Sequence, residues 1–392
     1  MMAERKKIAL CLEYPLALRG GVSVLVETLL EGLRERYEIV LVSPDNSESL
    51  RKQPAGEFIS GHIPWTPSAV SAPSSEQLAR ELARQKVKLA HFHIGGVYGW
   101  GNRFLRTCPI PRADKLGIAV FSTVHLVVSP LDGYCGPQKP LWFKLAMLPL
   151  AYSAKLRQLA HVRSEIAVSR HDAEKLRRWY RPLRGKFIHM YQSRLKKKSL
   201  PANDSAREPF VLNVGHIAWR KGQIVLAEAF AQVATRHPEW KLLMAGALLE
   251  VPTVEKIKAI AKTNGLEDRI LLPGERRDAM ELMQRARIYV QPSYHEALGL
   301  ALQEALFSAC PAIGTRAGGI PELIEHERTG LLVEPGNPME MAKALELLMC
   351  NPSLRERYGK QGAASILQKG MTAEQMVARH VELYESVLGI RP

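Results

Sequence analysis

The stretch Pro292-Ser-Tyr-His-Glu-Ala-Leu-Gly-Leu-Ala-Leu-Gln-Glu304 does most to decide the fold. An apolar run that ends at Gln291 predicts a buried strand, and the residues from about Gly299 onward predict a helix. Glu296 therefore lies in a loop between strand and helix, and Glu304 lies more than one turn inside the helix. Strands that alternate with helices in this way form parallel sheets covered by helices on both faces.

The predicted start of this helix offers a site for an anion. The backbone N–H groups of Gly299, Leu300 and Ala301 have no partner within a helix that begins there, and the helix dipole adds positive charge. A pyrophosphate suits this end, Glu304 can accept two hydrogen bonds from a ribose diol, and Glu296 can meet sugar hydroxyls. Two glutamates alone are more often an ordinary helix residue and a loop charge, so other motifs must support this interpretation.

A second motif, Val214-Gly-His-Ile-Ala-Trp-Arg-Lys-Gly222, supplies that support. A predicted strand ends at Gly215, a short loop follows, and the cations Arg220 and Lys221 precede a glycine that opens a helix. Arginine and lysine are the residue types that neutralise the charge of a diphosphate. The two motifs together therefore favour a site for a phosphorylated ligand.

Glycine turns occur in two further places. Ala317-Gly-Gly-Ile-Pro-Glu322 is a glycine turn before a predicted helix, and Thr329-Gly-Leu-Leu-Val333 predicts a strand after it. Near the start of the chain, Gly20 and Gly21 lie at the N-terminus of an amphipathic helix. A glycine backbone can approach a phosphate closely at such a position.

The alternation of strands and helices runs through both halves of the chain, which are joined by the polar, loop-like segment Arg194–Arg207. We predict two doubly wound α/β domains that divide near residue 205, with ligands bound outside the carboxyl ends of the strands, in a cleft between facing domains. The expected strands are Lys7–Leu12, Glu38–Val42, Lys88–His93, Ile118–His125, Phe210–Val214, Trp240–Ala245, Ile270–Leu272, Ile288–Val290 and Ala312–Ile313.

The composition is that of a globular protein, with 46% hydrophobic and 24% charged residues over 392 positions. No run approaches the roughly 18 apolar residues that span a bilayer, and Ile8–Leu12 predicts a buried strand rather than a signal peptide. The five cysteines are scattered and never form a C-x-x-C pair. This pattern argues against a zinc site and a disulfide framework, and it favours a cytoplasmic protein.

The net charge of +15 is concentrated in residues 101–200, which hold 20 Lys and Arg against five Asp and Glu. Such a field attracts anionic partners, although a solvated basic face is the simpler alternative. Within it, Lys139–Arg157 carries Trp142 and Phe143 among cations, which is typical of a helix at a membrane surface. The alternative is an ordinary helix with its apolar face in the core, which Pro149 would kink.

Taken together, these motifs resemble the retaining glycosyltransferases of the GT-B fold, specifically sequence family 4. The resemblance covers almost the whole chain and is strongest over Phe210–Pro335, in the order G-x-x-x-x-x-K-G, P-S-x-x-E-x-x-G-x-x-x-x-E-A, G-G-x-P-E and T-G-L-L-V. It implies an acceptor-side domain of residues 1–205, a donor-binding domain of residues 206–371, and a final helix within residues 372–392 that crosses back to the first domain. It also implies an enzyme that transfers a sugar from a nucleotide-sugar donor to a glycan, lipid-linked or other cell-envelope acceptor.

The resemblance assigns roles to the residues of these motifs. Arg220 and Lys221 would bind the donor diphosphate, Glu304 the ribose and Glu296 the transferred sugar. His125, at the end of a strand of the first domain, would lie near the reacting sugar, although a core or helix-capping histidine is the alternative. The catalytic set is thus Glu296, His125, Lys221 and Arg220. The donor would also contact Gly20, Gly21, Gly215, Gly274, Gly299, Leu300 and Ala301.

This chain departs from the family pattern at the cation loop and at the sugar pocket. The family often carries arginine directly after the first glycine of the cation loop, where this chain has His216, so the second cation must be Arg220. The usual E-G-F-G reads Glu296-Ala-Leu-Gly299 here. No D-x-D motif occurs, so we expect no metal and no cofactor, with cations and helix N-termini meeting the diphosphate charge.

Other function classes stay open on the sequence alone. A nucleic-acid-binding protein, or a transferase that glycosylates DNA, would use the basic first domain, and a GT-B phosphorylase or sugar-nucleotide epimerase would share the fold. We expect no nucleic acid partner, because a nucleic-acid-binding protein has no need of Glu296, Glu304 or Lys221. We expect a cytoplasmic protein and, as a hypothesis, peripheral contact with the inner face of the cell membrane through residues 101–200.

Overall fold

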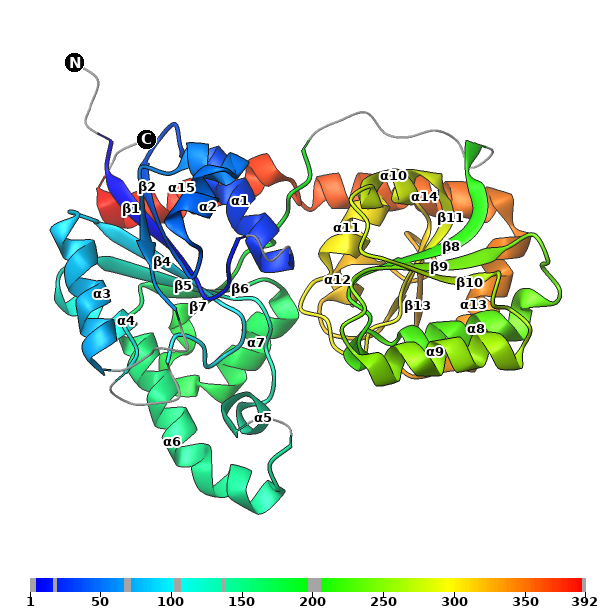
Figure 1. Cartoon of the computed structure of the whole chain (residues 1–392), viewed down its shortest axis with the longest axis horizontal. Coiled ribbons are helices and arrows are strands. Elements are labelled where there is room, and N and C mark those ends of the chain that lie inside the picture. Colours follow the sequence, from blue (N-terminus) through cyan, green and yellow to red (C-terminus); the bar gives the residue numbers. More distant parts are fainter. Residues whose placement is uncertain are drawn as a thin grey trace. The chain divides into compact units, whose positions relative to one another are not determined.

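The computed structural model describes residues 5–16, 20–66, 72–101, 107–135, 138–196 and 206–389. The chain divides into two compact units, which we call unit 1 (Met1–Arg194 and Ala373–Pro392) and unit 2 (Leu195–Thr372). The predicted boundary at residue 205 lies among residues 197–205, outside the described part. Figure 1 shows a sheet flanked by helices in each unit.

Unit 1 contains a parallel sheet of seven strands in the order β3-β2-β1-β4-β5-β6-β7. The strand order reverses direction between β1 and β4, as in Rossmann-like sheets. The strands are β1 (Lys7–Leu12), β2 (Glu38–Ser43), β3 (Gly61–Pro64), β4 (Leu89–Ile94), β5 (Ala119–Val124), β6 (Ser164–Ala167) and β7 (Phe187–His189).

Helices cover both faces of this sheet. They are α1 (Gly21–Leu33), α2 (Ser47–Arg51), α3 (Ala72–Arg84), α4 (Ile110–Lys115), α5 (Pro130–Cys135), α6 (Leu141–Ala160), α7 (Arg170–Trp179) and the final helix α15 (Ala373–Leu388). The 3₁₀ turns are Pro54–Phe58 and Arg181–Lys186.

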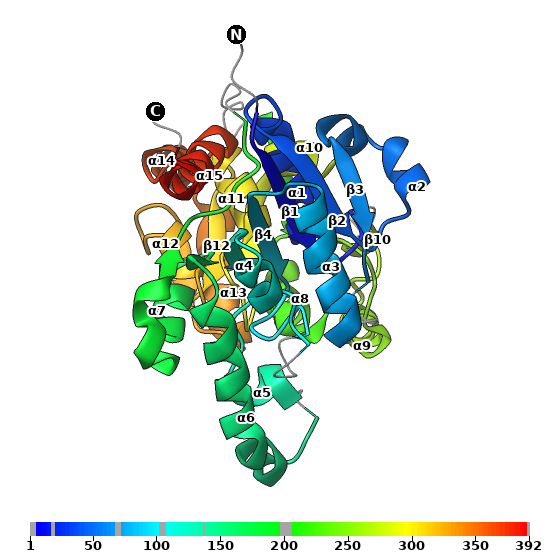
Figure 2. The same cartoon turned by 90° about the vertical axis from the view of Figure 1, so that its left-hand side faces the viewer.

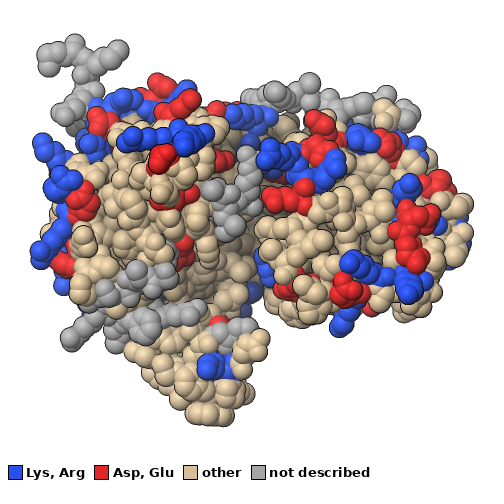
Figure 3. Space-filling view, in the orientation of Figure 1, with Lys and Arg blue, Asp and Glu red and all other residues tan. Residues whose placement is uncertain are grey.

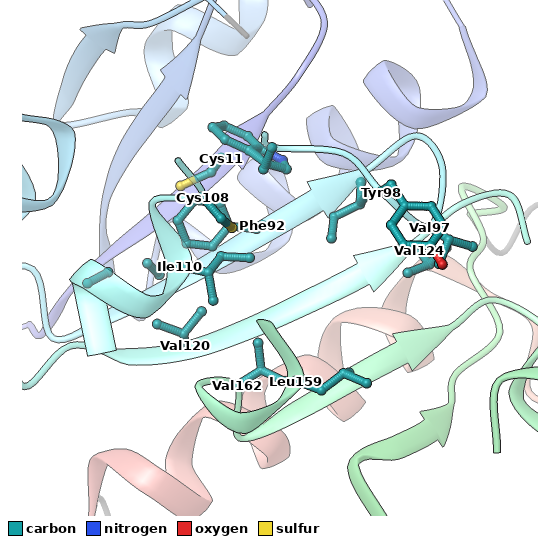
Figure 4. Packing of buried hydrophobic residues seen from close by; sticks show 14 of the residues in the cluster. Cys11, Phe92, Val97, Tyr98, Cys108, Ile110, Val120, Val124, Leu159 and Val162 are labelled. Atoms are coloured by element: carbon teal, nitrogen blue, oxygen red, sulfur yellow. The ribbon is translucent and has the colours of Figure 1, made fainter. Parts of the chain in front are cut away.

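The core of unit 1 lies where the helices pack on the central strands. Figure 4 shows Phe92, Val120 and Val124 from β4 and β5 together with Leu159 and Val162 from the end of α6 and the loop after it. All five side chains are buried. Strands buried on both faces require nearly continuous apolar sequence, which is why the runs of β1, β4 and β5 are recognisable in the sequence.

The final helix α15 belongs to unit 1 and packs against α1. Any side chain at Gly32 of α1 would overlap Val377 of α15, so the two helices approach closely at this point. An ion pair between Arg36 and Glu385 adds to this packing. The predicted helix that crosses back to the first domain is therefore confirmed.

Unit 2 contains a parallel sheet of six strands in the order β10-β9-β8-β11-β12-β13, with the reversal between β8 and β11. The strands are β8 (Glu208–Val214), β9 (Lys241–Ala245), β10 (Ile270–Gly274), β11 (Ala286–Gln291), β12 (Ala312–Thr315) and β13 (Leu331–Val333). The helices are α8 (Gln223–Ala234), α9 (Val251–Thr263), α10 (Ala279–Arg285), α11 (Leu300–Phe307), α12 (Ile320–Leu323), α13 (Pro338–Cys350) and α14 (Pro352–Gln368). The predicted class of two doubly wound, Rossmann-like units is therefore confirmed.

Helix α6 differs from the other helices of unit 1. Figure 2 shows it extending away from the sheet. Pro149 lies inside this helix without interrupting it. Side chains near its C-terminal end, such as Ala151 and Leu159, are buried, whereas Leu141 and Trp142 at its start are exposed. Within the described ranges, no helix combines the length and apolar character needed to cross a membrane.

Candidate functional site

The two sequence motifs of unit 2 meet where its strand order reverses. β8 and β11 are neighbours in the sheet, and in open parallel sheets the crevice at such a reversal is the usual ligand site. The chain leaves β8 at Gly215 and leaves β11 at Pro292. The loops that carry the predicted cations and the predicted glutamate therefore start from adjacent strand ends.

At the centre of these loops, Lys221 and Glu296 form an ion pair with 2.7 Å between Nζ and Oε2. The same carboxylate oxygen accepts hydrogen bonds from Gln291 Nε2 (3.1 Å) and Ser293 Oγ (3.3 Å). The Tyr289 hydroxyl donates to Gln291 Oε1 at 2.8 Å. The side chains of Lys221 and Glu296 keep 15% and 12% of their surface exposed, so this oriented pair remains accessible to a ligand.

The environment keeps Glu296 ionised. Burial raises the pKa of its carboxyl, but Lys221, Arg220 and the Ser293 hydroxyl together outweigh burial and lower the pKa below its ordinary value. A carboxylate at this position can only accept hydrogen bonds, as contact with sugar hydroxyls requires.

His216, which stands where the family often has arginine, adds no positive charge near neutral pH. Burial and the nearby cations Lys221 and Arg220 lower the pKa of its imidazole. The charge of this loop therefore comes from Arg220 and Lys221, as the sequence analysis requires.

Two glycines explain why the loops can approach so closely. Gly222 has φ of +70°, and a Cβ on it would overlap the carbonyl oxygen of Pro292. Gly318 has φ of +54°, and a Cβ on it would overlap the carbonyl oxygen of Glu296. Only glycine combines this backbone conformation with such contacts, so the glycines of two motifs serve to position Glu296 beside Lys221.

Helix α11 begins as predicted. Gly299 is its N-cap with φ of +98°, and its carbonyl accepts a hydrogen bond from Gln303 N at 3.0 Å. Leu300 and Ala301 form the first turn, so their N–H groups belong to the end that attracts anions. Glu304 lies in the second turn and is only 3% exposed.

Gly215 and Gly274 lie along the same edge of the sheet. Gly215 directly follows β8 and donates from N to Ala245 O at the end of β9 (2.9 Å), and Gly246 N donates to Gly274 O at the end of β10 (2.8 Å). The structure thus places the predicted residues of unit 2 at one edge of its sheet or at the start of α11.

One contact of this edge was missed by the sequence analysis. The rings of Trp219 and Tyr294 stack with 5.1 Å between centroids and 9° between planes. Tyr294 N also donates to Arg220 O at 2.9 Å, so the stack and this bond fasten the cation loop to the loop after β11. The sequence signal was one aromatic residue inside each motif. Trp219 is 57% exposed and offers a flat apolar surface beside the cations.

In unit 1, the predicted glycines lie at the start of α1. Gly20 is the N-cap and Gly21 is the first helical residue, and both are at least partly exposed. Arg19, which precedes them in the motif, lies outside the described residues. The helix that follows β1 thus presents its N-terminus as predicted, although Gly20 has an extended conformation that other residues also adopt.

His125 directly follows β5 and belongs to a group of four histidines in unit 1. Its Nε2 lies 3.1 Å from His93 Nδ1. Burial and His380 lower the pKa of His125 to about 3, so the imidazole is neutral and can exchange hydrogen bonds without carrying charge. His91 is bonded to Tyr384 and Thr123, at 2.6 and 2.8 Å.

Two protein families match most of this chain. Residues 196–365 match the glycosyl transferases group 1, and residues 19–189 match glycosyltransferase family 4. Each match falls largely within one of the two structural units.

Individual proteins agree with these family matches. The chain is 30% identical to the N-acetyl-alpha-D-glucosaminyl L-malate synthase of Bacillus anthracis over 184 residues, which are 47% of each chain. It is 25% identical to the sulfoquinovosyl transferase of Arabidopsis thaliana over 374 residues, which are 92% of this chain and 70% of the relative. The matches to the first four curated relatives span between 40% and 50% of each relative's length.

Among solved structures, Anabaena HepE superposes with a TM-score of 0.71 at 17% identity, covering 97% of this chain and 100% of the other. A likeness at this level of identity concerns the fold. The matching families, the fold and the order of the motifs agree, and the chain belongs to the GT-B glycosyltransferases of the group 1, family 4 type.

Proposed function

We propose that this protein is a retaining, metal-independent glycosyltransferase that moves a sugar from a nucleotide-diphosphate sugar to a glycan, lipid-linked or other cell-envelope acceptor. The observation that carries the proposal is the accessible Lys221–Glu296 ion pair, with Arg220 on the same loop, in the unit that also presents the N-terminus of α11. The cations and the N–H donors suit the diphosphate and the negative charge that develops on it. The carboxylate suits the transferred sugar.

The donor class is supported by the chemistry of this edge and by a relative in fold. Anabaena HepE has been crystallised with UDP, with UDP and glucose, and with UDP-glucose. In the present chain, Arg220, Lys221 and the N–H groups of Gly299, Leu300 and Ala301 would hold the diphosphate. Glu304 would accept hydrogen bonds from the ribose, and Glu296 from the transferred sugar.

The proposed reaction breaks the bond between the anomeric carbon and the diphosphate oxygen, which keeps the electron pair. Arg220 and Lys221 stabilise that oxygen, and Glu296 supports a sugar with oxocarbenium character. The acceptor oxygen then bonds to the same face of the sugar, and its proton passes to the departing diphosphate oxygen; the choice of face rests on the family resemblance. Exclusion of water would protect the donor from hydrolysis.

From unit 1, we assign His125 to the reacting sugar and Gly20 and Gly21 to the donor phosphates. A neutral imidazole suits the first role, because it can hydrogen-bond a sugar hydroxyl without attracting the leaving diphosphate. The hydrogen bond between His93 and His125 would hold the ring in place.

The exposed start of α6 supports the part of the proposal that concerns the acceptor. Leu141, Trp142 and Leu145 keep 63%, 70% and 51% of their surface exposed, and Lys139 lies over the Phe143 ring at 5.8 Å. Figure 3 shows the protruding end of this region as mostly uncharged surface. Exposed apolar and aromatic residues next to cations favour peripheral contact with an anionic membrane, where lipid-linked acceptors reside.

Co-sedimentation with vesicles tests the membrane part of the proposal. Binding should require anionic lipid, weaken with salt, and fall on Trp142→Ser and on Arg178→Gln with Arg181→Gln. Arg80→Gln is the matched control, because it removes another exposed cation of unit 1, from α3. A protein that ignores such vesicles but remains an active transferase would use its basic face for a soluble acidic acceptor.

A thermal-shift panel tests the donor part. UDP, GDP, ADP and CMP, and their sugars, are each added to the whole protein. One base should raise the midpoint of unfolding, because a ligand present at 100 times its Kd stabilises by about 2.7 kcal/mol. The shift should shrink in both Glu304→Ala and Lys221→Ala, whereas a shift unchanged by both substitutions would refute the assignment of this edge.

A further inference from the structure

A second cluster of ligand-forming side chains lies at the other end of α8. The helix starts beside the cation loop, and His237 follows its last turn, so His237 lies near the opposite edge of the sheet. There it meets Glu346 and Cys350, which are one turn apart on α13. One ligand atom from each of the three residues lies within 4.8 Å of the other two.

The chemistry of this cluster is that of a zinc site. Thiolate, imidazole and carboxylate are the ligands that Zn²⁺ takes in tetrahedral sites. Ordinary Zn–S and Zn–N bond lengths place S and N about 3.5 Å apart in a tetrahedron, and N and O about 3.3 Å apart. Cys350 Sγ lies 3.9 Å from His237 Nε2, and that nitrogen lies 3.1 Å from Glu346 Oε1. These two distances lie within a few tenths of an ångström of the tetrahedral values. Sγ lies within 4.8 Å of the glutamate oxygen, so the exposed Cys350 side chain would move toward Glu346 when an ion binds.

Two arginines fix the backbone that carries these ligands. Arg269 donates to the carbonyl of His237 at 2.6 Å and also to the carbonyls of Ala234 and Trp240. The buried Arg355 donates to the carbonyls of Leu348 and Met349 at the end of α13. Both ends of the cluster are thus held before any ion binds, which reduces the entropy that binding costs.

A third arginine orients the carboxylate. Arg236 Nη2 lies 2.5 Å from Glu346 Oε2, and Arg236 Nε lies 3.2 Å from both carboxylate oxygens, while Oε1 also lies 3.1 Å from His237 Nε2. The shorter bond holds the carboxylate by Oε2, as an outer hydrogen bond holds a ligating carboxylate in metal sites, and an ion at Oε1 would replace the longer contact to Nε.

We propose that His237, Glu346 and Cys350 bind one zinc ion, with water as the fourth ligand, and that the ion ties the end of α8 to α13. The proposal is independent of the transferase activity. It departs from the expectation drawn from the absence of C-x-x-C pairs, because the fold brings Cys350 to a histidine 113 positions away. The thiol must lose its proton when the ion binds, so affinity should increase with pH.

Cobalt titration of the whole protein, in chelator-treated buffer with a phosphine reductant, tests this site. One equivalent of Co²⁺ should produce the near-ultraviolet absorption of a thiolate–cobalt bond, and Zn²⁺ should remove it. Cys350→Ser should abolish the band, and His237→Gln or Glu346→Gln should weaken Co²⁺ binding at least about 10-fold. Zn²⁺ should also protect Cys350 from alkylation, as read by mass spectrometry.

Matched controls separate this site from chance binding. Cys135→Ser removes a half-buried thiol of unit 1, and Glu255→Gln removes an exposed carboxylate of α9, so both should leave the band unchanged. Circular dichroism of Cys350→Ser without metal should match that of the wild type, because Cys350 is exposed. The absence of a band in the wild type, or its persistence in Cys350→Ser, would overturn the proposal.

Discussion

Two lysine–glutamate pairs of this protein have the same contact distance but different surroundings. Lys155 and Glu165 in unit 1, and Lys221 and Glu296 in unit 2, are each 2.7 Å apart. The first pair is fully buried, whereas the second keeps 15% and 12% of its side-chain surface exposed. Distance alone therefore does not separate a structural ion pair from one that can meet a ligand.

The partners of the two pairs show the difference more clearly. Lys155 also donates to Val97 O and Gln158 Oε1, and Glu165 also accepts from Ser122 and Gln158. Other groups of the protein thus contact both members of this buried pair. In unit 2, Lys221 combines its bond to Glu296 with exposed surface, as a cation that receives an incoming phosphate requires.

The largest expected effect concerns the stability of the buried pair. Lys155→Ala should lower the free energy of unfolding by about 3–5 kcal/mol, because Glu165 would remain charged and buried without its partner. Chemical denaturation measures this loss. Lys155→Met combined with Glu165→Gln should recover most of it, since the glutamine can still bond Ser122 and Gln158. If the double variant did not recover stability, the loss in Lys155→Ala would come from packing around Lys155 rather than from the unpaired charge of Glu165.

The next effect concerns catalysis at the accessible pair. Lys221→Ala should reduce kcat by about 100- to 1,000-fold, because it removes a donor that stabilises the leaving diphosphate. Its stability should stay close to that of the wild type. Steady-state kinetics and a denaturation curve on the same sample check both parts. Wild-type turnover in this variant would mean that Lys221 does not act on the leaving group. A loss of activity explained by unfolding would mean that the Lys221–Glu296 pair is structural, like the Lys155–Glu165 pair.

A smaller effect is expected at Glu304, which would bind the donor without meeting the breaking bond. Hydrogen bonds to a charged group contribute about 1.5–3 kcal/mol, so Glu304→Ala should weaken donor affinity roughly 10- to 150-fold. Direct titration of the donor gives this value. If the loss appeared in kcat at saturating donor instead, Glu304 would act on the reaction and not on the ribose.

Much of the fold could be predicted because parallel strands buried on both faces need apolar runs. The ends of β1 and β8 lie within two residues of the predicted ones. The strands β3, β6 and β7 were not predicted. In β6 a charged residue interrupts the apolar pattern, since Glu165 is buried only because Lys155 neutralises it from α6. A pairing of that kind depends on tertiary contact and leaves no local signal.

The residues of unit 2's candidate site were predictable because they follow strand ends in sequence motifs, and the reversal of strand order brings the motifs together. Contacts that join elements far apart in the sequence were not predictable. His380 reaches the histidines of β4 from the last helix, and Cys350 reaches His237 from another helix. Such pairs share no period or motif, so only the folded chain reveals them.

The smallest expected effect is that of chelation. Transfer should continue in EDTA, because Arg220 and Lys221 supply the charge that a divalent cation would provide. The check is to measure initial rates with and without EDTA, and after addition of Mg²⁺ or Mn²⁺. The temperature should be one at which loss of the proposed zinc ion does not unfold unit 2. An absolute requirement for either cation would show that Arg220 and Lys221 alone do not neutralise the charge of the leaving diphosphate.

The central claim, that Lys221 acts on the donor diphosphate, is tested most directly by comparing two ligands in two proteins. Calorimetric titration of the preferred nucleoside diphosphate and of its monophosphate is carried out with the wild type and with Lys221→Ala. The wild type should prefer the diphosphate, and the variant should lose at least about 10-fold of that preference, as expected for a contact of 1.5–3 kcal/mol. A variant that keeps the full preference of the wild type would contradict the claim.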